Sequence, residues 1–297
     1  MEVLSQAFKD IIKQVVDLTK TFDLSVTEEN VYQKANKELL PLIAKMFDEI
    51  LLPGSGVYGM ENLNALLKKA QEGASCLLLL EHYSNFDLPA FSDLLRREPN
   101  GGKEVEDALV AIAGMKLNAD PVVAAFIAAY SRLVIYPSRS LSHLDPVKDR
   151  AEIVRSNGIN RAAMKALNTI KTQGKLVLVF PSGTRYRPWD PSTKRGVREI
   201  DSYIKSFDYM CLVAINGMLL HVREGNMMDD YITPDILQYT AGPVISTEEF
   251  REENRAKAEA AGIEDKKQAV VDAIMDELQI MHDKVEIERQ KSLEKLK

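Results

Sequence analysis

Residues 76–90 read CLLLLEHYSNFDLPA, a stretch that leaves a short apolar run and enters a helix-forming sequence. A bounded apolar run of this length is typical of a buried strand. Comparable runs recur along the chain with helical patterns between them, which predicts an α/β fold with helices flanking a mixed sheet. The expected strands are Cys76–Leu80, Leu109–Ala113, Leu133–Tyr136, Leu176–Phe180 and Cys211–Ile215, and the expected helices are Leu88–Arg97, Pro121–Ser131, Gly158–Thr172 and Gly196–Phe207.

Both ends of the chain have helical patterns without strands. Apolar residues recur at helical spacing over residues 4–18 and again from near Thr27 to Ile50, and Pro53-Gly54 ends this second pattern. We therefore expect a smaller helical N-terminal domain over residues 1–56 and an α/β catalytic domain over residues 57–297. The charged C-terminal segment is also expected to be helical, and its apolar stripe to pack on the domain; the stripe is Ala269, Ile274, Leu278 and Met281.

The bulk composition limits the function classes. A net charge of -6 with 45% hydrophobic residues fits a folded, soluble protein and disfavours broad nucleic-acid binding, which needs a basic surface. The N-terminus lacks the apolar core of a signal peptide, and no apolar run reaches the roughly 18 residues of a membrane span. We expect a protein of the cytoplasm or an organelle stroma, with Cys76 and Cys211 as buried free thiols and no metal site.

His82 and Asp87 are the candidate catalytic pair. His82 comes just after a predicted strand, and active sites of α/β sheets gather at the carboxyl ends of strands. The two side chains face each other only if a turn separates them, because on one helix they would point about 140° apart. A carboxylate on one ring nitrogen would orient the imidazole as a general base. The alternative for Asp87 is structural, since Ser84-x-x-Asp87 also fits a capping box.

Residues 177–189, VLVFPSGTRYRPW, form the candidate phosphate site. Pro181 and Gly183 predict a tight turn after the strand, so that Arg185 and Arg187 reach the same space; arginine binds phosphate through paired charged hydrogen bonds. The alternative is a basic loop paired with surface acids. Arg139 also follows a predicted strand and is a third candidate.

Taken together, these residues resemble the glycerolipid acyltransferase family, which carries His-x4-Asp and a later Phe-Pro-Glu-Gly-Thr-Arg block. Here the block is Phe180-Pro-Ser-Gly-Thr-Arg185, with Ser182 in place of the usual Glu. That change, the following Tyr-Arg-Pro and the stretch AGMKLNADP at residues 113–121 are similar to the soluble plastid-type glycerol-3-phosphate acyltransferases. The family's Asn before the catalytic His is Glu81 here, and Ser140 stands where a second basic residue is expected after Arg139. His143 is a candidate to assist there.

The resemblance implies transfer of a fatty acyl group from a thioester to the sn-1 hydroxyl of glycerol 3-phosphate. It implies no cofactor, because the thioester of coenzyme A or of acyl carrier protein is a co-substrate. A carrier protein would dock transiently, and Lys165, Lys171 and Lys175 hint at a basic patch for it. Membrane contact would be peripheral at most. By resemblance His82 and Asp87 are catalytic, and the substrate-binding residues are Arg139, Ser182, Gly183, Thr184, Arg185 and Arg187.

Other functions share some of these features. Lysophosphatidate acylation is the nearest alternative, although those enzymes usually carry an N-terminal membrane segment. Residues 54–59, GSGVYG, fit the dinucleotide fingerprint G-x-G-x-x-G of an NAD(P)-binding oxidoreductase, with Glu81 roughly twenty residues on. The fingerprint needs a preceding strand, whereas residues 39–52 predict a helix. A non-enzymatic lipid- or phosphate-binding module on the same fold is a third alternative.

Overall fold

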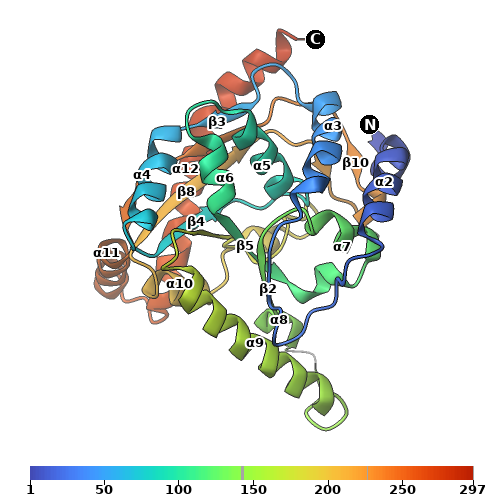
Figure 1. Cartoon of the computed structure of the whole chain (residues 1–297). Helices are drawn as coiled ribbons and strands as arrows, with labels where there is room; N and C mark the ends of the chain where they lie inside the picture. Colours follow the sequence, from blue (N-terminus) through green and yellow to red (C-terminus); the bar gives the residue numbers. More distant parts are fainter. Residues whose placement is uncertain (142–143, 226, 297) are drawn as a thin grey trace.

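The computed structural model describes residues 1–141, 144–225 and 227–296. A nine-stranded mixed sheet in the order β2-β6-β5-β7-β4-β8-β11-β3, with β12 beside β8, forms its centre (Figure 1). The five central strands are parallel: β4 (Cys76–Leu80), β5 (Leu109–Gly114), β6 (Arg132–Ile135), β7 (Leu176–Val179) and β8 (Tyr209–Asn216). The outer strands are β2 (Tyr32–Gln33), β3 (Gly56–Tyr58), β11 (Gln238–Ala241) and β12 (Ile245–Ser246), and a second small sheet holds β1 (Glu2–Val3), β9 (Leu220–His221) and β10 (Tyr231–Ile232).

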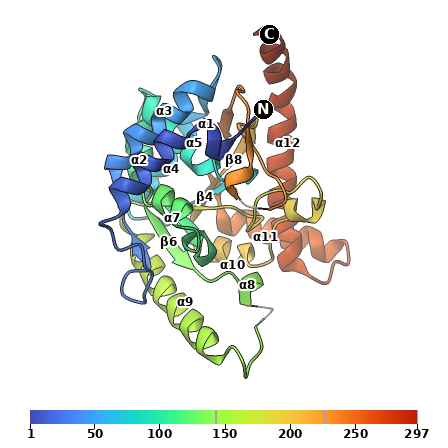
Figure 2. The same cartoon turned by 90° about the vertical axis from the view of Figure 1, so that its right-hand side faces the viewer.

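Helices cover both faces of the sheet, as Figure 2 shows edge-on. One face carries α1 (Leu4–Ala7), α2 (Lys9–Thr19), α3 (Leu40–Ile50), α4 (Met60–Gln71), α5 (Asp87–Arg97), α6 (Gly102–Ala108) and α7 (Pro121–Ile127). The other carries α9 (Arg150–Ile170), α10 (Ile200–Lys205), α11 (Thr247–Ala260) and α12 (Lys266–Glu294). Short turns complete the chain: α8 (Ser138–Leu141) and the 3-10 segments Lys37–Leu39, Met115–Asn118, Pro191–Lys194 and Met227–Asp229.

The central strands are apolar throughout because both faces are covered. Leu78 and Leu80 of β4 belong to the core under α3 and α5, whereas Leu77 and Leu79 belong to the core under α9 and α12. Successive strand residues point to opposite faces, so a strand between two helical layers needs apolar residues at every position. The predicted α/β fold with a mixed, helix-flanked sheet is confirmed.

The N-terminal region differs from the expected pair of helices in one respect. The predicted helix from Thr27 is wrong at its start: residues 27–30 form a turn, β2 then pairs with β6, and α3 begins only at Leu40. Pro41 lies in the first turn of α3, where its missing N–H costs nothing, and it could not sit inside a longer helix. Phe47 of α3 shares a buried cluster with Leu78, and the domain division at residue 56 stays a prediction.

The C-terminal segment is helical, as predicted. Ile274 and Leu278 of α12 are fully buried on the sheet, and α11 packs beside α12. Within the described ranges, no helix is both long and apolar enough to cross a bilayer.

The glycine-rich segment 54–59 follows helix α3 rather than a strand, which removes the geometry that the dinucleotide fingerprint requires. Its last glycine has a structural role. Gly59 has φ +78° and starts α4, and a Cβ at this position would collide with the carbonyl oxygen of Ala241. Gly59 thereby allows α4 to approach β11 closely.

We expect Gly59→Ala to lower the free energy of unfolding by about 2 kcal/mol or more, because left-handed backbone strain adds to a backbone collision. Chemical denaturation measures this change. Gly73→Ala is the matched control: Gly73 has φ +99° but open space around it, so it should cost only the roughly 1 kcal/mol of backbone strain. Equal losses in the two variants would contradict the close approach at Gly59.

Candidate active site

His82 and Asp87 lie in direct contact at the carboxyl end of β4. The Nδ1 atom of His82 is 2.9 Å from the Oδ2 atom of Asp87. The chain turns between β4 and α5, which supplies the break that the sequence requires for this pairing. Both side chains are largely buried, with exposed fractions of 16% and 6%.

The carboxylate of Asp87 also organises the turn itself. Its Oδ2 atom accepts hydrogen bonds from the backbone N–H groups of Tyr83 (2.5 Å) and Ser84 (2.8 Å), and its Oδ1 atom accepts from the Ser84 hydroxyl (2.8 Å). Ser84 Oγ in turn accepts from the N–H of Phe86. Asp87 therefore both organises the turn and pairs with His82. The capping box that the sequence offered as the alternative does not form, because α5 begins at Asp87 with Phe86 as its N-cap and without a side-chain cap hydrogen bond.

The imidazole of His82 is held on its face as well as at its edge. The ring stacks on Phe180, with centroids 3.9 Å apart and planes 16° from parallel. The backbone C=O of His82 accepts from the N–H of Tyr186, which joins the two candidate loops. Because Nδ1 is occupied by Asp87, Nε2 is the ring nitrogen left for a ligand, and His82 lines a cavity of about 1290 Å³.

The loop after β7 brings its arginines to the same cavity. Gly183, Thr184, Arg185 and Arg187 all line it, and Gly183 has φ +64°, which supports the predicted tight turn. Ser182 is buried under the loop, where its hydroxyl donates to the carbonyl oxygen of Thr184. Ser182 therefore shapes the turn in this structure.

Arg185 and Arg187 have different surroundings. One guanidinium nitrogen of Arg185 donates to Oδ2 of the buried Asp230 at 2.9 Å. Burial raises the pKa of Asp230, and the Arg223 N–H and the charge of Arg185 oppose that rise. Arg185 has four further N–H donors. Arg187 is exposed, and its guanidinium makes no hydrogen bond or ion pair with the residues that the structure describes.

The third candidate lies only partly within the described structure. Arg139 belongs to the short helix α8 after β6, and its side chain lies outside the described part. His143 lies outside the described residues. The neighbouring Ser140 lines the cavity.

Further basic residues at the cavity were not singled out in the sequence. Lys116, Arg195 and Arg198 line it, and the two arginines pair with Asp272 and Asp265 on the α12 side. The sequence pattern that could have identified Arg195 and Arg198 is the basic run KRGVR at residues 194–198, which follows the candidate phosphate loop. Nothing in the local sequence marks Asp230, because the chain brings it to Arg185 from 45 residues away.

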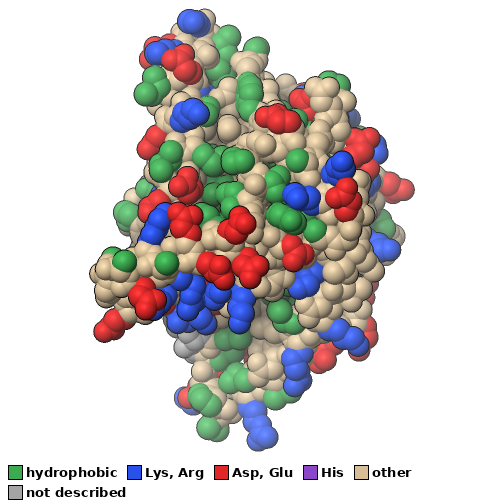
Figure 3. Space-filling view, turned by 90° about the vertical axis from the view of Figure 1, so that its left-hand side faces the viewer, with side chains coloured by type: hydrophobic (Ala, Val, Ile, Leu, Met, Phe, Trp, Pro, Cys, Tyr) green, Lys and Arg blue, Asp and Glu red, His purple; other side chains and the backbone are tan. Residues whose placement is uncertain are grey.

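The three lysines considered for carrier-protein docking lie elsewhere. They flank the end of α9 and the start of β7, at the opposite end of the sheet from His82. The ammonium group of Lys171 donates a hydrogen bond to the carbonyl oxygen of Ser206, and that of Lys175 donates to the carbonyl oxygen of Asp107. Figure 3, which looks onto the side that bears α4 and α11, shows basic side chains directly beside a row of acidic ones, so this side is not uniformly basic.

Glu81 connects the turn between β4 and α5 to α12. It is 3% exposed, and its Oε2 atom accepts from the N–H of Ile215 at 2.8 Å. Its Oε1 atom accepts from the Tyr83 hydroxyl at 2.7 Å, and His282 Nδ1 lies 3.3 Å from Oε2. Burial lowers the pKa of His282, but the hydrogen bond and charge of Glu81 outweigh it and raise the pKa overall.

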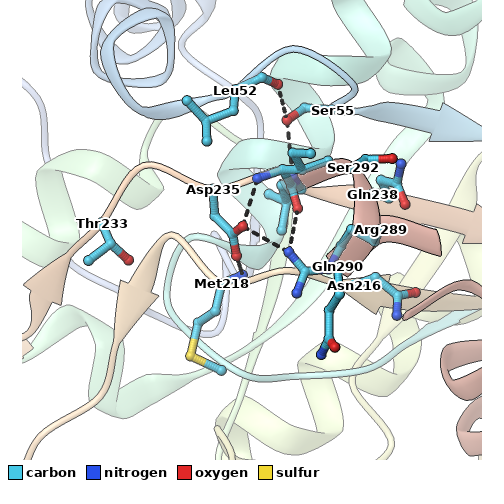
Figure 4. A network of polar contacts seen from close by, with 12 residues as sticks. Leu52, Ser55, Asn216, Met218, Thr233, Asp235, Gln238, Arg289, Gln290 and Ser292 are labelled. Carbon is cyan, nitrogen blue, oxygen red and sulfur yellow. Dashed lines mark hydrogen bonds and ion pairs between the residues drawn. The ribbon is translucent and has the colours of Figure 1, made fainter. Parts of the chain in front are cut away.

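The network continues along α12 through Asn216. The Asn216 amide donates to the carbonyl oxygen of His282 and to Glu286, and Arg289 also donates to Glu286. Figure 4 shows the next contact, in which Arg289 donates to Asp235. Partial burial raises the pKa of Glu286, but the hydrogen bonds from Arg289 and Asn216 lower it further, from the ordinary 4.5 to about 2. Glu81, in the position of the family's Asn, is thus one end of a network that fixes α12 to the sheet.

We expect acid to weaken this network. A carboxylate with a depressed pKa contributes stability that is present above pH 4.5 and is lost as pH falls toward 2. Urea denaturation across that window should show a steeper loss of unfolding free energy for the unmutated protein than for Glu286→Gln. The difference should be well below roughly 1.4 kcal/mol per pKa unit, because solvent screens this carboxylate. Glu288→Gln, on the exposed side of α12, should keep the steep profile. Parallel curves for the unmutated protein and Glu286→Gln would contradict this role.

One known family model matches the central part of the chain. Residues 55–221, more than half of the chain, match the family model described as Acyltransferase, of the glycerolipid acyltransferase superfamily. The match includes His82, Asp87 and the arginine loop. Comparison with curated proteins finds no significant match. On the family model and on the paired His82 and Asp87 at the mouth of a large cavity, the chain belongs to the Acyltransferase family.

Proposed function

We propose that this acyltransferase moves a fatty acyl group from a thioester to the sn-1 hydroxyl of glycerol 3-phosphate, giving lysophosphatidate. The observation that carries the proposal is that His82, held by Asp87, opens on the same cavity as Arg185 and Arg187. A base and two guanidinium groups around one space suit an acceptor that has both a hydroxyl and a phosphate.

His82 acts as the general base in the proposed reaction. With Nδ1–H donated to Asp87, Nε2 carries the lone pair that takes the proton from the acceptor hydroxyl. The alkoxide oxygen forms its bond to the thioester carbonyl carbon, and collapse of the tetrahedral intermediate breaks the carbon–sulfur bond. The imidazolium, stabilised by Asp87, returns the proton to the leaving thiolate.

Direct transfer agrees with the state of the cysteines. Burial raises the pKa values of Cys76 and Cys211 to about 12, so neither thiol supplies a thiolate near neutral pH. An acyl-cysteine intermediate is therefore not part of the proposal.

The oxyanion of the intermediate needs donors near His82. At the start of α5, the N–H of Asp87 donates to the carbonyl oxygen of Ser84, and Pro89 has no N–H. Leu88 lines the cavity, and among the described residues its N–H has no partner outside the helix. We assign the oxyanion to the Leu88 N–H at this helix start.

The apolar part of the cavity is the proposed site of the acyl chain. It extends between the sheet and the first helices, where Ile43, Phe47, Val123 and Phe126 are among the lining residues. The resemblance sets coenzyme A and acyl carrier protein as the two candidate donors. An assay that crosses both thioesters with glycerol 3-phosphate and lysophosphatidate tests the acceptor; exclusive acylation of lysophosphatidate would overturn the sn-1 proposal.

We expect His82→Ala to lower turnover by about 10²-fold or more while the fold is retained, because general-base catalysis is lost. Steady-state kinetics and circular dichroism measure the two effects. His221→Ala is the control, since His221 bonds to Thr233 outside this cavity and should keep normal turnover. Near-normal turnover in a folded His82→Ala protein would exclude the assignment.

We expect Arg187→Ala to raise the KM for glycerol 3-phosphate about tenfold with little change in stability, since a charged hydrogen bond contributes about 1.5–3 kcal/mol. Arg185→Ala should raise the same KM and also destabilise the protein, because it leaves Asp230 buried without its partner.

A double variant separates the two effects of Arg185. Arg185→Ala combined with Asp230→Asn should recover much of the stability but not the KM. Arg161→Ala, on the exposed side of α9, should change neither quantity. A change confined to the KM of the acyl donor would show that these arginines do not bind the phosphate.

A further inference from the structure

Arg132 is a buried cation without an acidic partner. It begins β6 and is 3% exposed. One terminal nitrogen donates to the carbonyl oxygen of Ile127 at 2.8 Å, and the buried Nε atom has no hydrogen-bond partner in the part of the chain that the structure describes. No carboxylate of the described residues lies within ion-pair distance of it.

Such a group is costly unless something pairs with it. Buried charges in proteins are ordinarily paired, and a buried donor without a partner loses the hydrogen bonds that it made to water. Burial lowers the pKa of Arg132 to about 10, the direction expected for a cation that has lost its water. A residue of this kind marks a position where the folded chain does not itself supply every hydrogen-bond partner of a buried charged group.

Tyr130, two residues earlier, has the same property. It is 6% exposed, and its buried hydroxyl has no hydrogen-bond partner among the described residues. Tyr130 and Arg132 both line the cavity that His82 lines. Two residues with unsatisfied donors therefore belong to the wall of one cavity, where Phe126 and Ile127 are apolar neighbours.

The sheet register places these residues far from the catalytic end. The cavity is lined by β5 from Gly114, at the carboxyl end, back to Ala111. Ala111 is paired with Arg132, and Gly114 with Ile135. The step from Gly114 to Ala111 spans about 10 Å at 3.3 Å per residue. Arg132 thus lies toward the amino ends of the strands, whereas His82, Arg185 and Arg187 lie at the carboxyl ends.

We infer that Arg132 and Tyr130 form a binding site for a carboxylate at the far end of the acyl chain. The inference rests on the proposed acyl transfer, and it names the class of acyl group: a chain that ends in a carboxylate rather than a methyl group. With its thioester at His82, such a chain would follow the apolar wall to the two donors. The phosphate of the acceptor does not compete, because its arginines are at the opposite end.

A carboxylate suits this pair of donors. It accepts two hydrogen bonds from a guanidinium in parallel and has lone pairs left for a phenol. Arg132 is already desolvated in the folded protein. Binding of a carboxylate therefore adds the desolvation cost of the carboxylate but not that of the guanidinium.

The test is equilibrium binding, measured by calorimetry without acceptor. The probes are two coenzyme A thioesters with the same number of carbons, one ending in a methyl group and one in a carboxylate. We expect the unmutated protein to bind the carboxylate-ended thioester about tenfold more tightly. Arg132→Met should abolish that preference and still bind the methyl-ended thioester. Tyr130→Phe should reduce the preference and serves as a second variant that keeps the cation; Arg161→Met is the surface control.

The outcomes separate this inference from the function beneath it. Equal binding of the two thioesters by the unmutated protein would overturn the carboxylate site and leave acyl transfer intact. A carboxylate preference that persists in Arg132→Met would also overturn it. Binding of neither thioester would overturn this inference, and the crossed assay with acyl carrier protein would then decide the proposed acyl transfer separately.

Discussion

The carboxylate of Asp87 is the constraint on which the site depends. It accepts from Tyr83 N–H, Ser84 N–H, the Ser84 hydroxyl and the His82 ring, so one side chain fixes the whole passage from β4 to α5. Hydrogen bonds to a charged acceptor are stronger than those between neutral groups. The turn, the direction of α5 and the orientation of the His82 ring therefore depend on one carboxylate. The backbone of Asp87 is also held, because the Tyr239 hydroxyl donates to the Asp87 carbonyl oxygen.

Parallel strands supply the remaining order. Because β4 and β7 are adjacent and parallel, their following loops meet, and Phe180 at the end of β7 stacks on His82. The loop that carries the arginines donates the Tyr186 N–H to the His82 carbonyl. His82 after one strand and the arginines after the neighbouring strand thus line the same cavity.

Features encoded locally could be predicted from the sequence. The strand β4 and the turn between His82 and Asp87 depend on nearby residues, and both were predicted correctly. The predicted start of the long helix α9 was Gly158, as expected if glycine, which disfavours helix interiors, lies at the end of a helix. The helix in fact begins at Arg150. Here Gly158 is inside the helix and packs against Glu28, where a Cβ would collide. Contacts between distant segments, such as Arg185 with Asp230 or β2 with β6, leave no local pattern to read.

The buried polar groups divide into two kinds, and the division has a physical meaning. Behind the turn between β4 and α5, the carboxylate of Glu81 is satisfied by Ile215, Tyr83 and His282. A satisfied network stabilises one arrangement, whereas an unsatisfied buried donor costs free energy in every copy of the folded protein. Arg132 is of the second kind, and it borders the cavity rather than the packed core on α12. An unsatisfied donor beside a cavity differs from one in the packed core. A ligand bound in the cavity can accept the missing hydrogen bond and so remove the free-energy cost of the unsatisfied donor.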